Sequence, residues 1–192
     1  MGRAVGSVQV RQFADAVENP IEPVQVIAAA ANGDVRAFER LYAHYAPTIY
    51  GLCLRLTGQR EAAEDCTQEA FVAAWRALGR FERRSLFSTW LQRIAIRTVL
   101  ARRRGLRFRN EVAEPPAGLP ELADPGAGAP ALDVERAIAA LPEGARHVLV
   151  LVGIYGYSHA EAAQTLGVAE GTCKAQLHRA RGLLTAALGL ED

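Results

Sequence analysis

Two short helical patterns separated by a break at Gly167-Val168 constrain the fold of this chain more than any other feature. The first pattern opens with Ser158 and Glu161, a capping box that satisfies free amides at a helix start. Gly167 is the residue type that most easily takes the left-handed conformation needed to leave a helix. A second helix is expected from about Ala169. Two short helices joined in this way, the second of them basic, are typical of a helix-turn-helix whose second helix reads the major groove of DNA.

The second helix of this motif has an expected inner and an expected outer face. Apolar spacing places on the inner face Val168, Thr172 or Cys173, Leu177, Ala180 and Leu184. The candidates for contacts with duplex DNA are Ser158, Thr172, Lys174, Gln176, His178, Arg179 and Arg181. Arg with guanine and Gln with adenine are the geometrically favoured pairs. A plain helical hairpin with a solvated basic face is the alternative.

A separate segment, residues 80–109, concentrates positive charge. It holds ten arginines against one acid, Glu82, although the whole chain carries a formal charge of only +1. Such clustering indicates a surface for a polyanion, because charge placed for solubility alone is interspersed with acids. Phe81, Phe87 and Trp90 lie among the arginines and offer faces on which unpaired bases stack. Trp90 also has the helical spacing of a core residue, and the sequence leaves both roles open.

Acidic and amide side chains form one ridge on a helix that is apolar on its other side. Asp65 stands three and four residues before Gln68 and Glu69, which places all three on the same face. A solvated face is the simplest interpretation. A carboxylate pair for a metal is less favoured because no histidine lies nearby, and no cofactor or metal is expected.

The remaining pattern predicts an all-α chain of two small helical domains joined by a flexible linker rich in Pro and Gly. No alternating strand pattern of useful length occurs. Helices are expected over about 23–31, over 34–57 with Asp34 as the cap and Thr57-Gly58 as the end, from about Arg60 to Leu78, and from Ser85 or Leu86 to Arg104. The predicted divisions are a tail at 1–22, a first domain at 23–104, a linker at 105–132 and a second domain at 133–192.

Composition points to a cytoplasmic protein. Three cysteines without a close pair make zinc ribbons and redox motifs unlikely candidates and favour a reducing compartment. No apolar run approaches the length of a membrane span, and the first twenty residues lack the core of a signal peptide.

Several short sequence segments, in the same order along the chain, resemble the second and fourth conserved regions of bacterial sigma factors of the extracytoplasmic-function (ECF) group. The second region is matched from Gly33 to Arg104 and the fourth from Leu141 to Leu188. The matching segments are residues 33–42, 56–58, 63–71, 75–78, 89–95, 141–142 and 177–181. The first segment starts with Gly-Asp-Val-Arg-Ala-Phe, and the last is Leu-His-Arg-Ala-Arg.

This resemblance implies a protein that binds core RNA polymerase and directs promoter-specific initiation without chemistry of its own. The first domain would recognise and melt the minus-10 element, and the second would read the minus-35 element. The implied polymerase contacts are Asp65, Gln68 and Glu69. The implied minus-10 contacts are Arg80, Phe87, Trp90, Arg93, Arg97, Arg102, Arg103 and Arg104.

The resemblance also implies an inhibitory anti-sigma partner, often membrane-bound, which would hold the protein at the inner membrane. The acidic linker would pass through the polymerase cleft, whereas its composition alone favours an ordinary solvated tether.

Two departures from the family pattern prevent the promoter sequence from being borrowed from relatives. Arg97 and Ala101 stand where the family commonly has Asn and Asp, so Arg97 is expected to contact phosphate. Ala175 and Gln176 stand where the recognition helix often has Ser and Arg.

Two other classes of protein are alternatives. A stand-alone helix-turn-helix regulator explains residues 158–181 but leaves the arginine segment and the acidic ridge unused. An enzyme would have to use His159 with Glu161, or Cys66 with a distant histidine, and no motif supports either pair.

Overall fold

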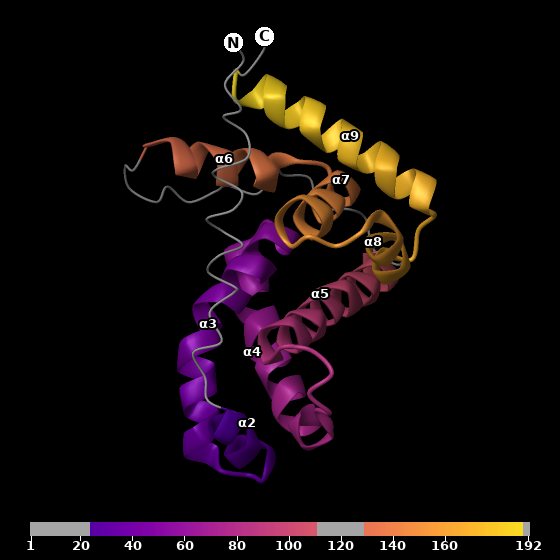
Figure 1. Ribbon diagram of the computed structural model, residues 1–192. Coiled ribbons are helices and arrows are strands. Elements are labelled where there is room, and N and C mark those ends of the chain that lie inside the picture. The colour runs from indigo at the N-terminus through magenta and orange to yellow at the C-terminus, as the bar shows by residue number, and fades with distance from the viewer. Residues whose placement is uncertain (1–23, 111–128, 190–192) are drawn as a thin grey trace, which may run out of the picture.

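The computed structural model describes residues 24–110 and 129–189, and these residues form helices without any strand, as the sequence predicts. They divide into a lower group, α2 to α5, and an upper group, α6 to α9 (Figure 1). The lower group consists of α2 (Val24–Ala31), α3 (Val35–Thr57), α4 (Arg60–Ala77), the 3-10 turn η1 (Leu78–Arg80) and α5 (Phe87–Asn110). The upper group consists of α6 (Ala129–Ala140), α7 (Glu143–Val148), the π-helical turn η2 (Leu149–Ile154), α8 (His159–Leu166) and α9 (Glu170–Ala187).

The long helix α3 begins and ends where its capping residues require. The Asp34 carboxylate accepts hydrogen bonds from the backbone N–H groups of Arg36 at 2.9 Å and Ala37 at 3.2 Å. At the other end, Gly58 has φ +70° and its N–H donates to the Leu54 carbonyl oxygen at 2.8 Å. A left-handed residue at this position suits glycine, which lacks the Cβ that makes the conformation costly for other residues. The predicted start and end of this helix are confirmed.

The lower core lies between α3, α4 and α5. Leu41, Ile49 and Leu52 of α3 are fully buried against it. The buried positions of α4 are mostly small, namely Ala63, Cys66, Thr67, Ala70, Phe71 and Ala74. Small side chains let helix axes approach closely, and the larger residues of α3 and α5 fill the space between them.

The upper core is built by the turn around η2 and by the helical pair α8 and α9. Val148, Val150 and Leu151 are almost completely buried. Alanines 162 and 163 on α8 face Cys173, Leu177 and Ala180 on α9, all of them buried. The small alanines allow α9 to cross close to α8, which fixes the direction in which the outer face of α9 points.

The expectation for Val168 needs correction, and the structure adds detail on the ends of the linker and on the inner residue of α9. Helix α5 continues through Gly105 to Asn110 and α6 begins at Ala129, so regular structure extends into both ends of the linker expected at 105–132. Arginines are good helix formers and outweigh the single Gly105, while Pro130 falls in the first turn of α6, where a missing N–H costs little. On α9 the inner residue is Cys173, not Thr172, and Val168 is 41% exposed. The acidic linker residues 111, 114, 121 and 124 lie outside the described part of the chain.

The two groups of helices are in direct contact. Helices α6 and α7 lie over the C-terminal end of α3, and the α7 to α8 region also approaches α5 (Figure 1). This contact places parts of the two candidate DNA-binding surfaces beside each other.

Candidate nucleic-acid interface

The capping box that positions α8 is formed as the sequence predicts. The Ser158 hydroxyl accepts from the N–H of Glu161 at 3.2 Å, and the Glu161 carboxylate accepts from the Ser158 N–H at 2.9 Å and hydroxyl at 2.8 Å. These hydrogen bonds from Ser158 hold the pKa of the Glu161 carboxyl below its ordinary value. Gly167 then leaves the helix with φ +70°. The helix-turn-helix is therefore defined by its own local chemistry.

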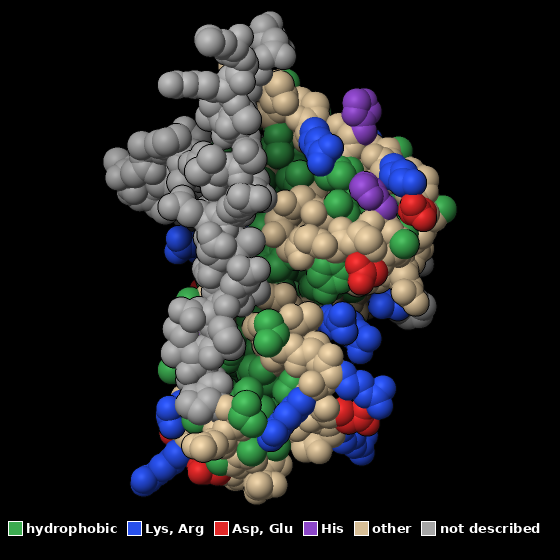
Figure 2. Space-filling view, viewed as in Figure 1, with side chains coloured by type: hydrophobic (Ala, Val, Ile, Leu, Met, Phe, Trp, Pro, Cys, Tyr) green, Lys and Arg blue, Asp and Glu red, His purple; other side chains and the backbone are tan. Residues whose placement is uncertain are grey.

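The outer face of α9 carries most of the predicted duplex contacts. Of these, Thr172, Lys174, His178, Arg179 and Arg181 are exposed, and so is Ser158 at the start of α8. Figure 2 shows basic and histidine side chains on the surface of the upper domain. Gln176 is half-buried and lies against α7, where its Nε2 atom is 3.4 Å from the position of a Cβ on Gly144. Lys174 is held by Glu170 at 2.7 Å, one turn earlier on the same helix.

The arginines of α5 divide into exposed and engaged side chains. Arg93, Arg97 and Arg104 are exposed, as is Arg80 before the helix. Arg102, in contrast, contacts Asp65 at 2.9 Å and Glu69 at 3.8 Å. The sequence predicts a DNA contact for Arg102, which stays a prediction; in the structure the guanidinium is paired with the acidic ridge of α4.

Arg103 is also engaged, but with the upper domain. Its Nε donates to the Glu143 carboxylate at 2.9 Å, and its Nη1 is 3.3 Å from Nδ1 of His147. Arg103 was expected to contact phosphate in the minus-10 region. In this structure its guanidinium is paired with a carboxylate of α7.

An aromatic cluster lies at the start of α5. Phe87 is only 5% exposed and packs on Tyr45, with ring centroids 5.2 Å apart. Phe81 and Trp90 are half-buried, 4.9 Å apart, and both contact Phe87. Phe87 was expected to contact bases, but its burial makes it the support on which Phe81 and Trp90 rest. The two roles left open for Trp90 are combined, since the ring packs on the core and keeps an exposed portion.

The segment between η1 and α5 holds the aromatic cluster close to exposed charge. Arg83 has φ +56°, the one positive φ outside glycine among the described residues. A non-glycine residue in this region is strained, and such strain is often found at functional sites. The side chains of Arg83 and its neighbour Arg84 are both exposed.

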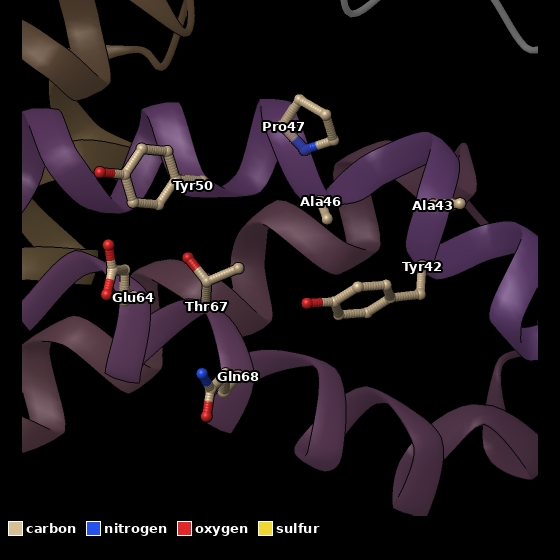
Figure 3. A pocket seen from close by; sticks show the side chains of 8 residues that line it. All are labelled: Tyr42, Ala43, Ala46, Pro47, Tyr50, Glu64, Thr67 and Gln68. Carbon is tan, nitrogen blue, oxygen red and sulfur yellow. The ribbon is translucent and has the colours of Figure 1, made fainter. Parts of the chain in front are cut away.

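The acidic ridge on α4 adjoins an open groove between α3 and α4. Asp65, Gln68 and Glu69 are all exposed. The groove has a volume of about 450 Å³. Its lining residues are Tyr42, Ala43, Ala46, Pro47, Tyr50, Glu64, Thr67 and Gln68, with the two tyrosines of α3 facing Glu64, Thr67 and Gln68 of α4 (Figure 3). The ridge and the groove share Gln68 and form one continuous surface.

The surroundings of Cys66, which an enzyme would have to use as a nucleophile, do not suit that role. Burial raises the pKa of the Cys66 thiol to about 11, so the group is protonated at neutral pH and is a poor nucleophile. Within residues 24–110 and 129–189, no three His, Cys, Asp or Glu side chains are grouped as a metal site. In the same residues, no helix is long and apolar enough to cross a membrane.

Sequence reasoning missed the residues that join the two domains. They are Arg55, Glu135, Glu143, Arg146 and His147. No local signal could have found them, because the partners are 80 to 91 residues apart along the chain for the contacts made by α3.

Comparison with known protein families matches both domains. Residues 41–109 match sigma-70 region 2, and residues 131–184 match sigma-70 region 4. Over 169 residues the chain is 36% identical to the ECF RNA polymerase sigma factor SigM of Mycobacterium tuberculosis, covering 86% of this chain and 84% of the relative. The chain belongs to the ECF family of RNA polymerase sigma factors. The resemblance stated from the sequence segments is thus confirmed.

Other relatives of this ECF sigma factor agree. It is 34% identical to SigE of Mycolicibacterium smegmatis over 92% of this chain and 73% of that protein. It is 33% identical to the sigma-H factor of Pseudomonas aeruginosa over 85% of this chain and 92% of that protein. Among solved structures, CnrH in complex with the cytosolic domain of CnrY is 28% identical with a TM-score of 0.51, covering 87% of this chain and 97% of CnrH. The sigma factor RpoE of Bartonella quintana, bound to the anti-sigma factor NepR, shares the fold with a TM-score of 0.60 at 24% identity, over 82% of this chain and all of that one.

Proposed function

We propose that this sigma factor binds core RNA polymerase and directs promoter-specific initiation, with the lower domain at the minus-10 element and the upper domain at the minus-35 element. The observation that carries the proposal is the presence of two basic surfaces on two separate domains, each matched to its own sigma region. A stand-alone regulator would use α8 and α9 alone and leave the α5 surface without a purpose.

In the upper domain, α9 reads the duplex through its exposed face. Lys174, Arg179 and Arg181 supply positive charge, and Thr172 and His178 lie on the same exposed side. Entry of such a helix into the major groove brings side chains near its N-terminus to base edges while others contact phosphate. Gln176 reads a base only after it leaves Gly144, because its amide lies against α7.

In the lower domain, Phe81 and Trp90 form the platform for unpaired bases. Arg80, Arg93 and Arg97 surround the platform with exposed charge for the phosphates of the same strand. Base stacking and phosphate contact together stabilise the single strand, which favours opening of the duplex. Arg97 replaces the base-contacting asparagine common in the family and contributes affinity with little sequence information.

The polymerase contact is assigned to the ridge of Asp65, Gln68 and Glu69. These side chains are exposed and adjoin the apolar groove, so a helical partner with basic and apolar residues could bind both at once. Arg102 contacts two of the three and orients their carboxylates.

Regulation by an anti-sigma partner is the remaining part of the proposal. The solved structure of RpoE is a complex with the anti-sigma factor NepR, and that of CnrH is a complex with the cytosolic domain of CnrY. We place this sigma factor in the cytoplasm, held at the inner membrane when such a partner binds it. Bond making in initiation belongs to the polymerase, and this chain contributes binding and positioning only.

Run-off transcription on a promoter library tests the proposal. Core polymerase with this chain should initiate at templates that share two spaced elements, and polymerase alone should not. The Asp65→Asn, Glu69→Gln double variant should lose initiation while retaining DNA binding, whereas Glu39→Gln, at an exposed position on α3, serves as the matched control. Retention of DNA without initiation by the unchanged chain would favour the stand-alone regulator.

A further inference from the structure

The rotation of α9 about its own axis is fixed by its packing. Cys173, Leu177 and Ala180 are buried, on the side of α9 that contacts α8. At 3.6 residues per turn, Ala175 lies about 200° around the helix from Cys173, on the side opposite the core. Its side chain is exposed. Ala175 therefore lies at the centre of the face that α9 presents to solvent.

The two polar residues next to Ala175 in the sequence are both engaged within the domain. Lys174 is ion-paired with Glu170 at 2.7 Å, one turn earlier on the same helix. Gln176 is half-buried, and its amide lies against Gly144 of α7. The group left at the centre of the exposed face is the methyl group of Ala175, which forms no hydrogen bond.

Two glycines lie on the same side of α9 as Ala175. Gly171 precedes Ala175 by four residues and Gly182 follows it by seven, which places all three on one face. A Cβ added at either glycine would meet nothing within 4 Å. Glycine within a helix is less stable than alanine, and no packing among the described residues requires it here. Without side chains at these positions, however, the backbone of α9 can approach another molecule closely.

Duplex DNA is expected against this face for reasons that do not depend on the small residues. Helices α8 and α9 form a helix-turn-helix, and residues 131–184 match sigma-70 region 4. The second helix of such a motif lies in the major groove, where residues in its N-terminal part contact base edges. Ala175 lies in the second turn of α9, with the exposed Thr172 and Arg179 one turn before and after it.

Of the four bases, only thymine presents a methyl group in the major groove. Guanine, adenine and cytosine present hydrogen-bonding atoms, whereas thymine adds its C5-methyl group to the O4 acceptor. An alanine methyl group contacts that C5-methyl group favourably, but it leaves a polar base edge without a partner. Because the alanine side chain is a single carbon, the helix must come close to the base, and Gly171 permits this approach.

We propose that Ala175 determines base preference in the minus-35 element and selects thymine by contact between its methyl group and the C5-methyl group of the base. Gly171 and Gly182 let α9 come close enough for this contact, while Thr172 and Arg179 contact the DNA on either side. The inference rests on the proposed function, because it requires that α9 read the minus-35 duplex.

Removal of one methyl group from the DNA tests the contact. The probe is a fluorescent promoter duplex selected by run-off transcription, in which each minus-35 thymine is replaced in turn by deoxyuridine, which lacks only the C5-methyl group. Core polymerase with the unchanged chain should bind one of these duplexes about fourfold more weakly, the effect of one buried methyl group. With Ala175→Gly the same replacement should have no effect, and any loss of helix stability acts on both duplexes equally. No effect in the unchanged chain, or an equal effect in both proteins, would overturn the proposal.

The glycines are tested by opposite effects on stability and on binding. Gly171→Ala and Gly182→Ala should each raise the urea midpoint of unfolding and yet weaken binding of the selected duplex severalfold, because the added Cβ separates the helix from the bases. Gly51→Ala, in α3, is the matched control: its Cβ would meet only Nη1 of Arg55, at 3.5 Å, and duplex binding should stay unchanged. Unchanged binding in both α9 variants would overturn the close approach on which the methyl contact depends.

Run-off transcription and binding by the full chain alone separate this result from the proposed function. If the chain by itself distinguishes thymine from uracil in duplexes selected by binding, but polymerase does not initiate, the sigma role fails and the methyl contact stands. Normal initiation, with the thymine and uracil duplexes bound equally well, overturns the methyl contact and leaves the sigma role intact.

Discussion

At the scale of single residues, Gly58 shows how one position can meet a local and a long-range demand. Its φ of +70° ends α3, and the absence of a side chain admits the guanidinium of Arg146. A Cβ at this position would lie 2.9 Å from Nη1 of Arg146. The local demand is visible in the sequence, but the long-range demand is not.

Gly58→Ala should therefore cost more stability than the same change at Gly33, which has φ +93° and no neighbour within 4 Å of an added Cβ. We expect Gly33→Ala to lower the free energy of unfolding by about 1 kcal/mol, and Gly58→Ala by about 2 kcal/mol, since only the latter also displaces Arg146. Urea unfolding measures both. Adding Arg146→Met should remove the difference between the two alanine variants, and a difference that persists would contradict the role given to Arg146.

His147 gives a second residue-scale prediction, based on its neutral ring. Its pKa is lowered from 6.5 to about 4, chiefly by burial and also by the adjacent Arg103 and Arg146, while Glu143 and the Leu56 carbonyl oppose the shift. Nδ1 faces an Arg103 nitrogen, so it accepts a hydrogen bond and Nε2 donates to Leu56.

Because the folded pKa lies below the ordinary value, the stability that His147 contributes is complete above pH 6.5 and is lost as pH falls through about 4. Between pH 7 and 4.5, the unfolding midpoint of the unchanged chain should fall more than that of His147→Gln. The carboxylates titrate in both proteins, so the comparison isolates the histidine. Parallel curves would show that His147 has the same pKa in the folded and unfolded chain.

At the scale of elements, the arginines of α5 differ in their surroundings. Arg97 is exposed, whereas Arg102 is bound to Asp65 and Glu69 of α4. Helix periodicity alone cannot separate these roles, because α4 determines which arginine meets an acid. In the proposed function, α5 therefore serves both DNA binding and the polymerase-binding ridge.

Salt dependence of oligonucleotide binding separates the two arginines. A cation that contacts a phosphate releases counterions, so Arg97→Gln should reduce the slope of log affinity against log salt by about 0.7 for a single strand. Arg102→Gln should leave the slope unchanged, because its guanidinium is already paired. An equal loss of slope in both variants would place Arg102 on DNA, as first expected from the sequence.

At the scale of the whole molecule, the domain contact links the stability of the two cores. Both tryptophans of the chain, Trp75 and Trp90, lie in the lower domain, while far-UV circular dichroism reports helices in both domains. The two signals therefore distinguish unfolding of one domain from unfolding of the whole.

In the unchanged chain, tryptophan fluorescence and circular dichroism should report the same urea transition if the contact couples the domains. In Arg146→Met, the Thr57 carbonyl loses its partner and the Leu56 carbonyl keeps only His147, so circular dichroism should begin to fall at a lower urea concentration than tryptophan fluorescence. Arg76→Met, at an exposed position on α4, should keep the transitions together. Coincident transitions in Arg146→Met would mean that the contact contributes little to stability.

Local chemistry explains which parts of the structure could be predicted. The Asp34 cap, the Gly58 and Gly167 ends and the Ser158 capping box act within a few residues, so their helices were foreseen. Helical structure also reaches past Gly105 and includes Pro130, because both residues are tolerated where they fall. Phe87 and Trp90 are both aromatic and close in sequence, and only packing against Tyr45 made one of them core and left the other partly exposed.

The sequence by itself determined the helices, the division into two domains and the two concentrations of basic residues, because these depend on periodicity, capping and composition within short segments. Only the tertiary structure decided which arginines are free, since Arg55, Arg102 and Arg103 meet acids from other helices. The same holds for the cap that Arg146 and His147 place on α3. Charge pairing and hydrogen bonding act over a few ångströms in space, and separation along the chain does not record which residues will come within that range.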